Sequence, residues 1–211
     1  MGLYLKKKLD NEAEIAVWQI TETEEELKEL SATPSDEMEE ISFIRSESLR
    51  KQRLAVRALL NTLFDEKVYL SHHDNGKPYL ENNPVNISIT HTEKYVAVIL
   101  HEEENVGIDI ESLDRDFSAV EKKALSEDEI ADLEDEKRIE QLAIYWCAKE
   151  AVFKLLSRYN VDFAEQIEIE RFRPRGEGEL EATFTSKNEE EEFDLEYITF
   201  DRHVLVWVVG E

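Results

Sequence analysis

A strand-like segment and an amphipathic helix each occur twice in this chain, and both repeats have the same spacing. Shifting the apolar segment that begins at Ile15 by 93 residues places it on the segment that begins at Ile108. The same shift carries the helix-like segment at Leu54 onto the one at Cys147. Two elements that share one offset indicate a duplicated chain, although few residues are identical and a coincidence of pattern stays open.

Each proposed half runs from a strand through helices to further strands. The sequence therefore predicts an α+β fold, a pseudo-twofold duplication of two similar α+β halves with the active site in the cleft between them. The halves are residues 1–102 and residues 103–211, and the second carries the candidate metal-binding carboxylates. The clearest helix begins at Ser46, and its apolar residues recur at helical spacing: Leu49, Leu54, Val56, Leu60 and Leu63. The acidic run NEEEEF from Asn188 is predicted to be a solvated loop.

The charge balance limits the possible partners. The chain has 25 lysines and arginines against 50 aspartates and glutamates, a net charge of −25. Such a protein is a poor nucleic-acid binder, because phosphate contacts need lysine and arginine, and it should be repelled by anionic membranes. No apolar run reaches the roughly 18 residues of a membrane span. Cys147 is the only cysteine, which excludes an internal disulfide and fits a cytoplasmic protein.

Two carboxylates stand two residues apart in the apolar segment VGIDIES, which begins at Val106. Because strand side chains alternate, Asp109 and Glu111 share one face, while Ile108 and Ile110 share the other. Two hard oxygen ligands about 7 Å apart can converge on one divalent cation. Magnesium suits such a sparse site, since it takes further ligands from water and substrate phosphates. The same pattern also describes the exposed polar face of a half-buried strand.

The segment YWCAKEAVFKLL is predicted to be helical and carries a third carboxylate. Trp146, Glu150 and Lys154 lie four residues apart and therefore share one helix face. Glu150 would suit metal binding or proton transfer, and Lys154 would suit the charge of a phosphate. An ordinary surface pair of glutamate and lysine has the same spacing, so this alternative stays open.

Further polar residues of the N-terminal half are candidates for anion binding. His91 ends a strand-like segment, with Thr90 beside it, and a histidine at a strand end can donate to a phosphate. Lys77 is held in the turn GKP. Arg53 and Arg57 are one helical turn apart and are able to grip one anion together. A structural histidine and solvated helix arginines are the simpler explanations of these positions.

Four motifs in this order, GKPYL, NISITH, VGIDIE and WCAKEAVFKL, resemble the motif series of the 4′-phosphopantetheinyl transferase superfamily, in particular its longer two-half members. The resemblance runs from about Arg53 to Lys154, roughly half the chain, and its last two motifs are the most specific. It implies a pseudo-twofold α+β fold that binds coenzyme A between its halves. It also implies transfer of 4′-phosphopantetheine from coenzyme A to a serine of an apo acyl or peptidyl carrier protein, with release of adenosine 3′,5′-bisphosphate.

The resemblance implies a role for each candidate residue. Asp109, Glu111 and Glu150 look like the magnesium ligands, and Glu150 or a nearby water would take the serine proton. Lys154 would neutralise charge on the transferring phosphate, and His91 would touch the pyrophosphate. The residues implied in coenzyme A binding are Lys77, Thr90, His91, Arg53, Arg57 and Lys154. After Lys154 the chain reads LLSRYNVDF instead of the family's glycine-rich stretch, so the loop that faces the carrier is expected to differ.

The leading hypothesis is a magnesium-dependent phosphopantetheinyl transferase, a cytoplasmic monomer with no nucleic-acid or membrane partner. The alternative within the same family is a catalytically degenerate member that binds coenzyme A or a carrier protein without turnover. Two unrelated alternatives are an acidic interaction domain and a phosphohydrolase that uses the same carboxylates.

Overall fold

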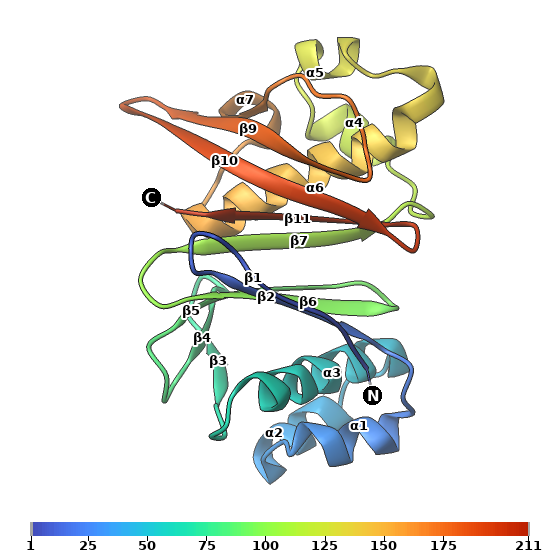
Figure 1. Ribbon diagram of the computed structural model, residues 1–211, viewed down its shortest axis with the longest axis vertical. Helices are drawn as coiled ribbons and strands as arrows, with labels where there is room; N and C mark the ends of the chain where they lie inside the picture. Colours follow the sequence, from blue (N-terminus) through green and yellow to red (C-terminus); the bar gives the residue numbers. More distant parts are fainter. Residues whose placement is uncertain (1, 211) are drawn as a thin grey trace. The chain divides into compact units, whose positions relative to one another are not determined.

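The computed structural model describes residues 2–210 and divides into two compact units, Met1–Glu103 and Glu104–Glu211. Each unit has a main antiparallel sheet with helices packed on one of its faces (Figure 1). The predicted α+β class is therefore confirmed, whereas the duplication stays a prediction. No helix within residues 2–210 combines the length and the apolar composition that crossing a membrane requires.

The first unit contains six strands and three helices. In chain order they are β1 (Leu3–Lys8), β2 (Glu14–Gln19), α1 (Glu24–Ser31), α2 (Ser35–Ser42), α3 (Glu47–Leu63), β3 (Leu70–His72), β4 (Pro78–Leu80), β5 (Asn86–His91) and β6 (Tyr95–His101). The main sheet has the strand order β1-β2-β6-β5, and β3 and β4 form a separate hairpin. Helix α3 packs on β2 and β6 and completes the core of this unit.

Helix α3 begins where the sequence predicts, because the hydroxyl of Ser46 accepts a hydrogen bond of 3.3 Å from the backbone N–H of Leu49. Leu54 and Leu60 are buried as expected. Leu49, in contrast, is 47% exposed, because it lies in the first turn, before the buried stripe of the helix begins. The edge strand β1 was not predicted, since its sequence LYLKKK is rich in lysine and mostly exposed.

The second unit contains five strands and the longest helix of the described chain. In chain order its elements are β7 (Val106–Ser112), α4 (Ser118–Lys123), α5 (Glu127–Ala131), the 3₁₀ helix η1 (Asp135–Lys137), α6 (Arg138–Leu156), α7 (Phe163–Gln166), β8 (Ile167–Ile169), β9 (Glu177–Ser186), β10 (Glu189–Phe200) and β11 (His203–Val209). The strand order is β7-β11-β10-β9-β8, entirely antiparallel. The order β7-β11-β10 has the same connectivity as β2-β6-β5 in the first unit.

Helix α6 is buried on most of its circumference and lies along one face of this sheet, next to β7 and β11 (Figure 1). The sequence of a helix that is covered on nearly all sides is apolar throughout rather than amphipathic. The centre of α6, LAIYWCA, has this composition. The left-handed residue Ser157, with φ 52°, ends it.

The prediction of a loop at NEEEEF was wrong. Strand β10 begins at Glu189, and its first residues pair with β9, for example Glu190 with Thr185. Backbone pairing satisfies the N–H and C=O groups of these residues, while most of their carboxylates remain exposed. A charged strand of this kind has no alternation of apolar and polar residues to indicate it.

Candidate active site

The face of β7 that carries Asp109 and Glu111 is turned toward helix α6. Gly107 lies on the same face, and a Cβ built on it would be 1.9 Å from the backbone oxygen of Ala151 in α6. Only glycine therefore allows strand and helix to approach this closely. The close approach buries Asp109, which is 6% exposed, and leaves Glu111 half-buried. The two acids are thus not an exposed strand edge.

Helix α6 presents Trp146, Glu150 and Lys154 to this strand. The ammonium Nζ of Lys154 donates to Asp109 Oδ1 at 2.7 Å and to the backbone oxygen of Ile108 at 2.9 Å. Lys154 is therefore not a partner of Glu150 in an ordinary surface pair. It bridges helix and strand, and its positive charge stands next to the most buried carboxylate of the site.

Glu111 is held by different partners. Its Oε1 accepts a hydrogen bond of 3.1 Å from Trp146 Nε1 and forms an ion pair with Arg115. The guanidinium of Arg115 also lies over the rings of Phe117 and Trp146, 5.4 Å from each centroid. Arg115 has no place in the family motifs quoted above. Its spacing of four residues from Glu111 was the one sequence signal of this contact.

Glu150 stands in an environment that disfavours its ionised form. Burial, followed by the negative charge of Asp109, raises its pKa from 4.5 to about 7, and Lys154 and Arg115 oppose this rise. Within residues 2–210 the Glu150 carboxylate makes neither a hydrogen bond nor an ion pair. A carboxylate that lies near a second carboxylate and has no direct cationic partner favours the approach of a cation.

The chemistry of the donors fits a divalent cation, although the side chains are not gathered around one point. Within the described residues no three His, Cys, Asp or Glu side chains are grouped closely enough to hold a metal ion. Asp109 and Glu150 are electrostatic neighbours, whereas Glu111 is turned to Arg115 and Trp146. Carboxylate oxygens are the ligands that magnesium prefers, and among the described residues Glu150 alone of the three makes no ion pair. The assignment of Asp109, Glu111 and Glu150 as its ligands stays a prediction.

We expect the variant Glu150→Gln to be more stable than the parent at high pH in the presence of a chelator. Because the folded-state pKa is raised, the ionised carboxylate opposes folding above about pH 7, and this cost disappears below pH 4.5. The difference in unfolding free energy should grow from near zero at pH 4.5 to at most about 3 kcal/mol at pH 8, at ~1.36 kcal/mol per pKa unit. Urea unfolding at several pH values measures it.

The exposed strand residue Glu177 provides a control for this titration. Glu177→Gln removes the same charge outside the site and should change stability by less than about 0.5 kcal/mol at every pH. A parent protein that is more stable than Glu150→Gln at pH 8 would contradict the environment described for Glu150.

The lysine that precedes Glu150 has a structural role that the sequence did not indicate. Lys149 is completely buried, and its Nζ contacts Glu129 Oε2 at 2.7 Å and donates to the backbone oxygens of Phe163 at 2.8 Å and Ile167 at 2.6 Å. The other oxygen of Glu129 accepts from the N–H of Ile169 at 2.9 Å. This buried ion pair fixes α6 to α5, α7 and β8 and so holds the helix that carries Glu150 and Lys154.

The candidates of the first unit occupy three places. His91 and Thr90 stand at the end of β5, where Thr90 is buried and His91 exposed. Lys77 follows Gly76, whose φ of 84° makes the turn, and partial burial lowers the pKa of Lys77. Arg53 and Arg57 lie on α3.

Arg53 and Arg57 line a cavity of about 500 Å³ at α2, α3 and β3. Arg57 forms an ion pair with Glu37, and burial lowers the pKa of Arg57. Burial and the two arginines lower the pKa of His72, which lines the same cavity. The structure thus brings the two arginines together on one cavity, as their spacing predicts, but one of them already has an acidic partner.

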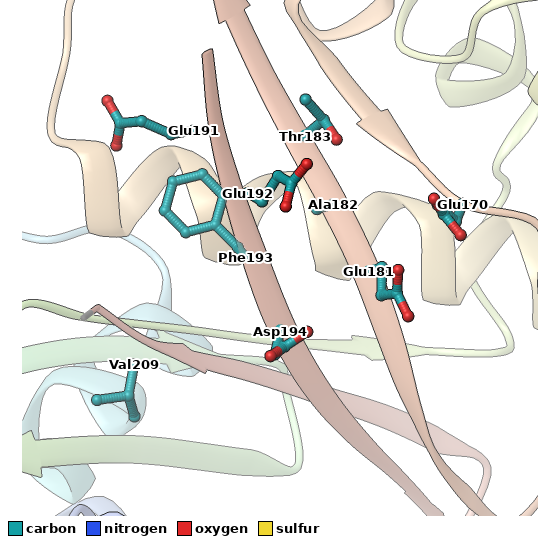
Figure 2. A pocket seen from close by; sticks show the side chains of 9 residues that line it. All are labelled: Glu170, Glu181, Ala182, Thr183, Glu191, Glu192, Phe193, Asp194 and Val209. Carbon is teal, nitrogen blue, oxygen red and sulfur yellow. The ribbon is translucent and has the colours of Figure 1, made fainter.

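A second cavity, of about 450 Å³, lies on β9 and β10 (Figure 2). The charged residues that line it are all acidic, and Asp194 lies directly opposite Glu181 in the strand register. Glu192, on the same strand as Asp194, adds a further carboxylate (Figure 2). Facing like charges destabilise a strand pair and repel phosphate, so this cavity is not a candidate for a phosphate-bearing ligand.

Comparison with known protein families finds a match in the second unit. The family model described as the 4′-phosphopantetheinyl transferase superfamily matches residues 105–208. The matched span includes both β7 and α6 and therefore all the carboxylates of the site. A search of the curated proteins finds no match.

Proposed function

We propose that this protein, whose residues 105–208 match the model of the 4′-phosphopantetheinyl transferase superfamily, transfers the 4′-phosphopantetheine group of coenzyme A to a serine of an apo acyl or peptidyl carrier protein. The family match supports phosphopantetheinyl transfer as the general class of reaction. The carrier substrate, the dependence on magnesium and the release of adenosine 3′,5′-bisphosphate are parts of the proposal, as are a cytoplasmic location and a monomeric state.

The observation that carries the proposal is the meeting of β7 and α6 across Gly107. It places Asp109, Lys154 and Glu150 in one half-buried cluster within the matched span. Phosphoryl transfer requires positioning and charge neutralisation more than covalent participation of the protein. A lysine and several carboxylates on two rigid elements meet this requirement.

The residues of the cluster suit distinct steps. The serine Oγ of the carrier attacks the phosphorus that bears the pantetheine group, and the anhydride bond to adenosine 3′,5′-bisphosphate breaks. Glu150, or a water near it, accepts the serine proton. The ammonium of Lys154 neutralises negative charge on the phosphoryl oxygens. Coenzyme A would also contact Lys77, Thr90, His91, Arg53 and Arg57 of the first unit.

Magnesium, held by Asp109, Glu111 and Glu150, would supply charge neutralisation and orientation of the pyrophosphate. All three side chains offer the oxygen ligands that magnesium prefers. Binding of a metal ion to Oε1 of Glu111 would require this atom to exchange its present partners, Trp146 and Arg115.

The direct test incubates the protein with coenzyme A, magnesium and a panel of apo acyl and peptidyl carrier proteins. We expect the mass of at least one carrier to increase by one phosphopantetheine group on its serine, measured by intact-protein mass spectrometry. The same carrier with that serine replaced by alanine should gain no mass, and a chelator should prevent the reaction.

Absence of a mass increase with every carrier would refute the proposed transfer for a folded preparation. Calorimetry with coenzyme A then separates the alternatives. Tight binding without turnover identifies a catalytically degenerate member of the family, and absence of binding favours the acidic interaction domain.

A further inference from the structure

We propose that Arg115 is a positioning residue that competes with a divalent cation for Glu111 and thereby sets the affinity of the site for the metal. This inference rests on the proposed function for the identity of the metal site. In this exchange a divalent cation replaces the guanidinium of Arg115 at Glu111. The family motifs give Arg115 no such role.

Arg115 supplies a positive charge at a carboxylate that is a proposed ligand of the metal ion. It pairs with the Oε1 atom of Glu111, the same atom that accepts from Trp146. Lys154 pairs in a similar way with Asp109 Oδ1 at 2.7 Å. Three carboxylates, Asp109, Glu111 and Glu150, thus have two protein cations near them, Arg115 and Lys154.

The two protein cations are not held equally. Lys154 has a second bond, to the backbone oxygen of Ile108, and its side chain is 26% exposed. The side chain of Arg115 is 39% exposed, and within residues 2–210 its guanidinium contacts only Glu111 and the faces of two aromatic rings. A partly exposed ion pair and contacts with ring faces hold a side chain less firmly than a less exposed ammonium with two oxygen acceptors, so Arg115 is the cation that a metal ion would displace.

Electrostatics gives the direction of the effect. A divalent cation bound to Glu111 would stand close to the guanidinium if Arg115 stayed in place, and two positive groups at short distance repel each other. Magnesium must therefore displace Arg115 before it can use the Oε1 atom. Removal of the arginine charge should accordingly strengthen the binding of magnesium, whereas a residue that merely supports the fold would weaken it.

The test titrates magnesium chloride into the full-length protein by calorimetry, without coenzyme A or carrier. We expect Arg115→Gln to bind magnesium about tenfold more tightly than the parent, with Arg115→Lys between them because it keeps the charge but loses the planar fork. Arg115→Met, which keeps apolar contact with the two rings, should behave like Arg115→Gln and covers the case that glutamine disturbs the fold.

The matched control is Arg202→Gln. Arg202 forms an exposed ion pair with Asp114 at 2.6 Å in the same unit, and its loss changes the net charge equally. This control should bind magnesium within about twofold of the parent. Unchanged or weaker binding by folded Arg115→Gln or Arg115→Met overturns the inference, as does the absence of magnesium binding by every variant.

Two experimental outcomes separate the role of Arg115 from the transfer reaction. Modification of a carrier protein together with equal magnesium affinities would remove the role of Arg115 and leave the transferase intact. A tenfold gain in magnesium affinity without modification of any carrier would do the reverse.

Discussion

Replacement of Asp109 by asparagine is expected to lower the rate of phosphopantetheine transfer by about 1,000-fold or more. The substitution removes the most buried carboxylate of the site and the negative charge that Lys154 compensates. Charge stabilisation by a metal and its ligands is worth several kcal/mol, and each 1.4 kcal/mol or so corresponds to a factor of ten in rate. Mass spectrometry of a modified carrier over time measures this loss.

The fold should survive this substitution. Asparagine has nearly the volume of aspartate, and its side-chain oxygen is able to accept from Lys154, which keeps its bond to Ile108. We therefore expect the melting temperature to stay within a few degrees of the parent. Asp194→Asn on β10 is the matched control, because it removes a carboxylate that faces Glu181 in the same sheet, and it should retain full activity. Unchanged transfer by Asp109→Asn would remove this residue from the reacting site.

The second large effect concerns stability. We expect Lys149→Met to lower the free energy of unfolding by about 3–5 kcal/mol, because it leaves the buried Glu129 without a compensating charge. The carbonyl oxygens of Phe163 and Ile167 also lose their donor. Urea denaturation followed by circular dichroism gives the value.

Two further variants define the origin of this loss. Lys137, which directly precedes α6, is half-exposed and pairs with Glu140 in the first turn of that helix. Lys137→Met should lower the free energy of unfolding by less than about 1 kcal/mol. The double variant Lys149→Met with Glu129→Gln removes the orphaned charge and should recover part of the loss. A cost for Lys149→Met as small as that for Lys137→Met would show that the buried pair does not stabilise the fold.

The local structure of the site was predictable because it depends on short-range periodicity. Alternation along VGIDIES places Asp109 and Glu111 on one face, and the spacing in WCAKEAVFKLL places Glu150 and Lys154 on one helix turn. Both statements describe relations within one element. Neither states which face of the strand or helix is covered, so a buried cluster and a solvated surface remained equally compatible with the sequence.

The contacts between elements were not predictable. Lys149 and Glu129 are a lysine and a glutamate among many in a chain with a net charge of −25, and nothing local marks them as a buried pair. Arg115 lies outside the motifs, and its contact with Trp146 arises only when β7 and α6 pack together. The acidic start of β10 was predicted to be a loop because its pairing with β9 leaves no apolar pattern in the sequence.

The sequence by itself determined the α+β class, the principal strands and helices, and the residue types that a phosphoryl-transfer site needs. These depend on hydrophobic periodicity and side-chain chemistry, which are properties of neighbouring residues. Only the tertiary structure decided that Lys154 neutralises Asp109, that Arg115 and Trp146 hold Glu111, and that burial and Asp109 raise the pKa of Glu150 to about 7. The physical reason is that burial and charge proximity are created by packing across Gly107, where β7 and α6 approach more closely than any other residue would allow.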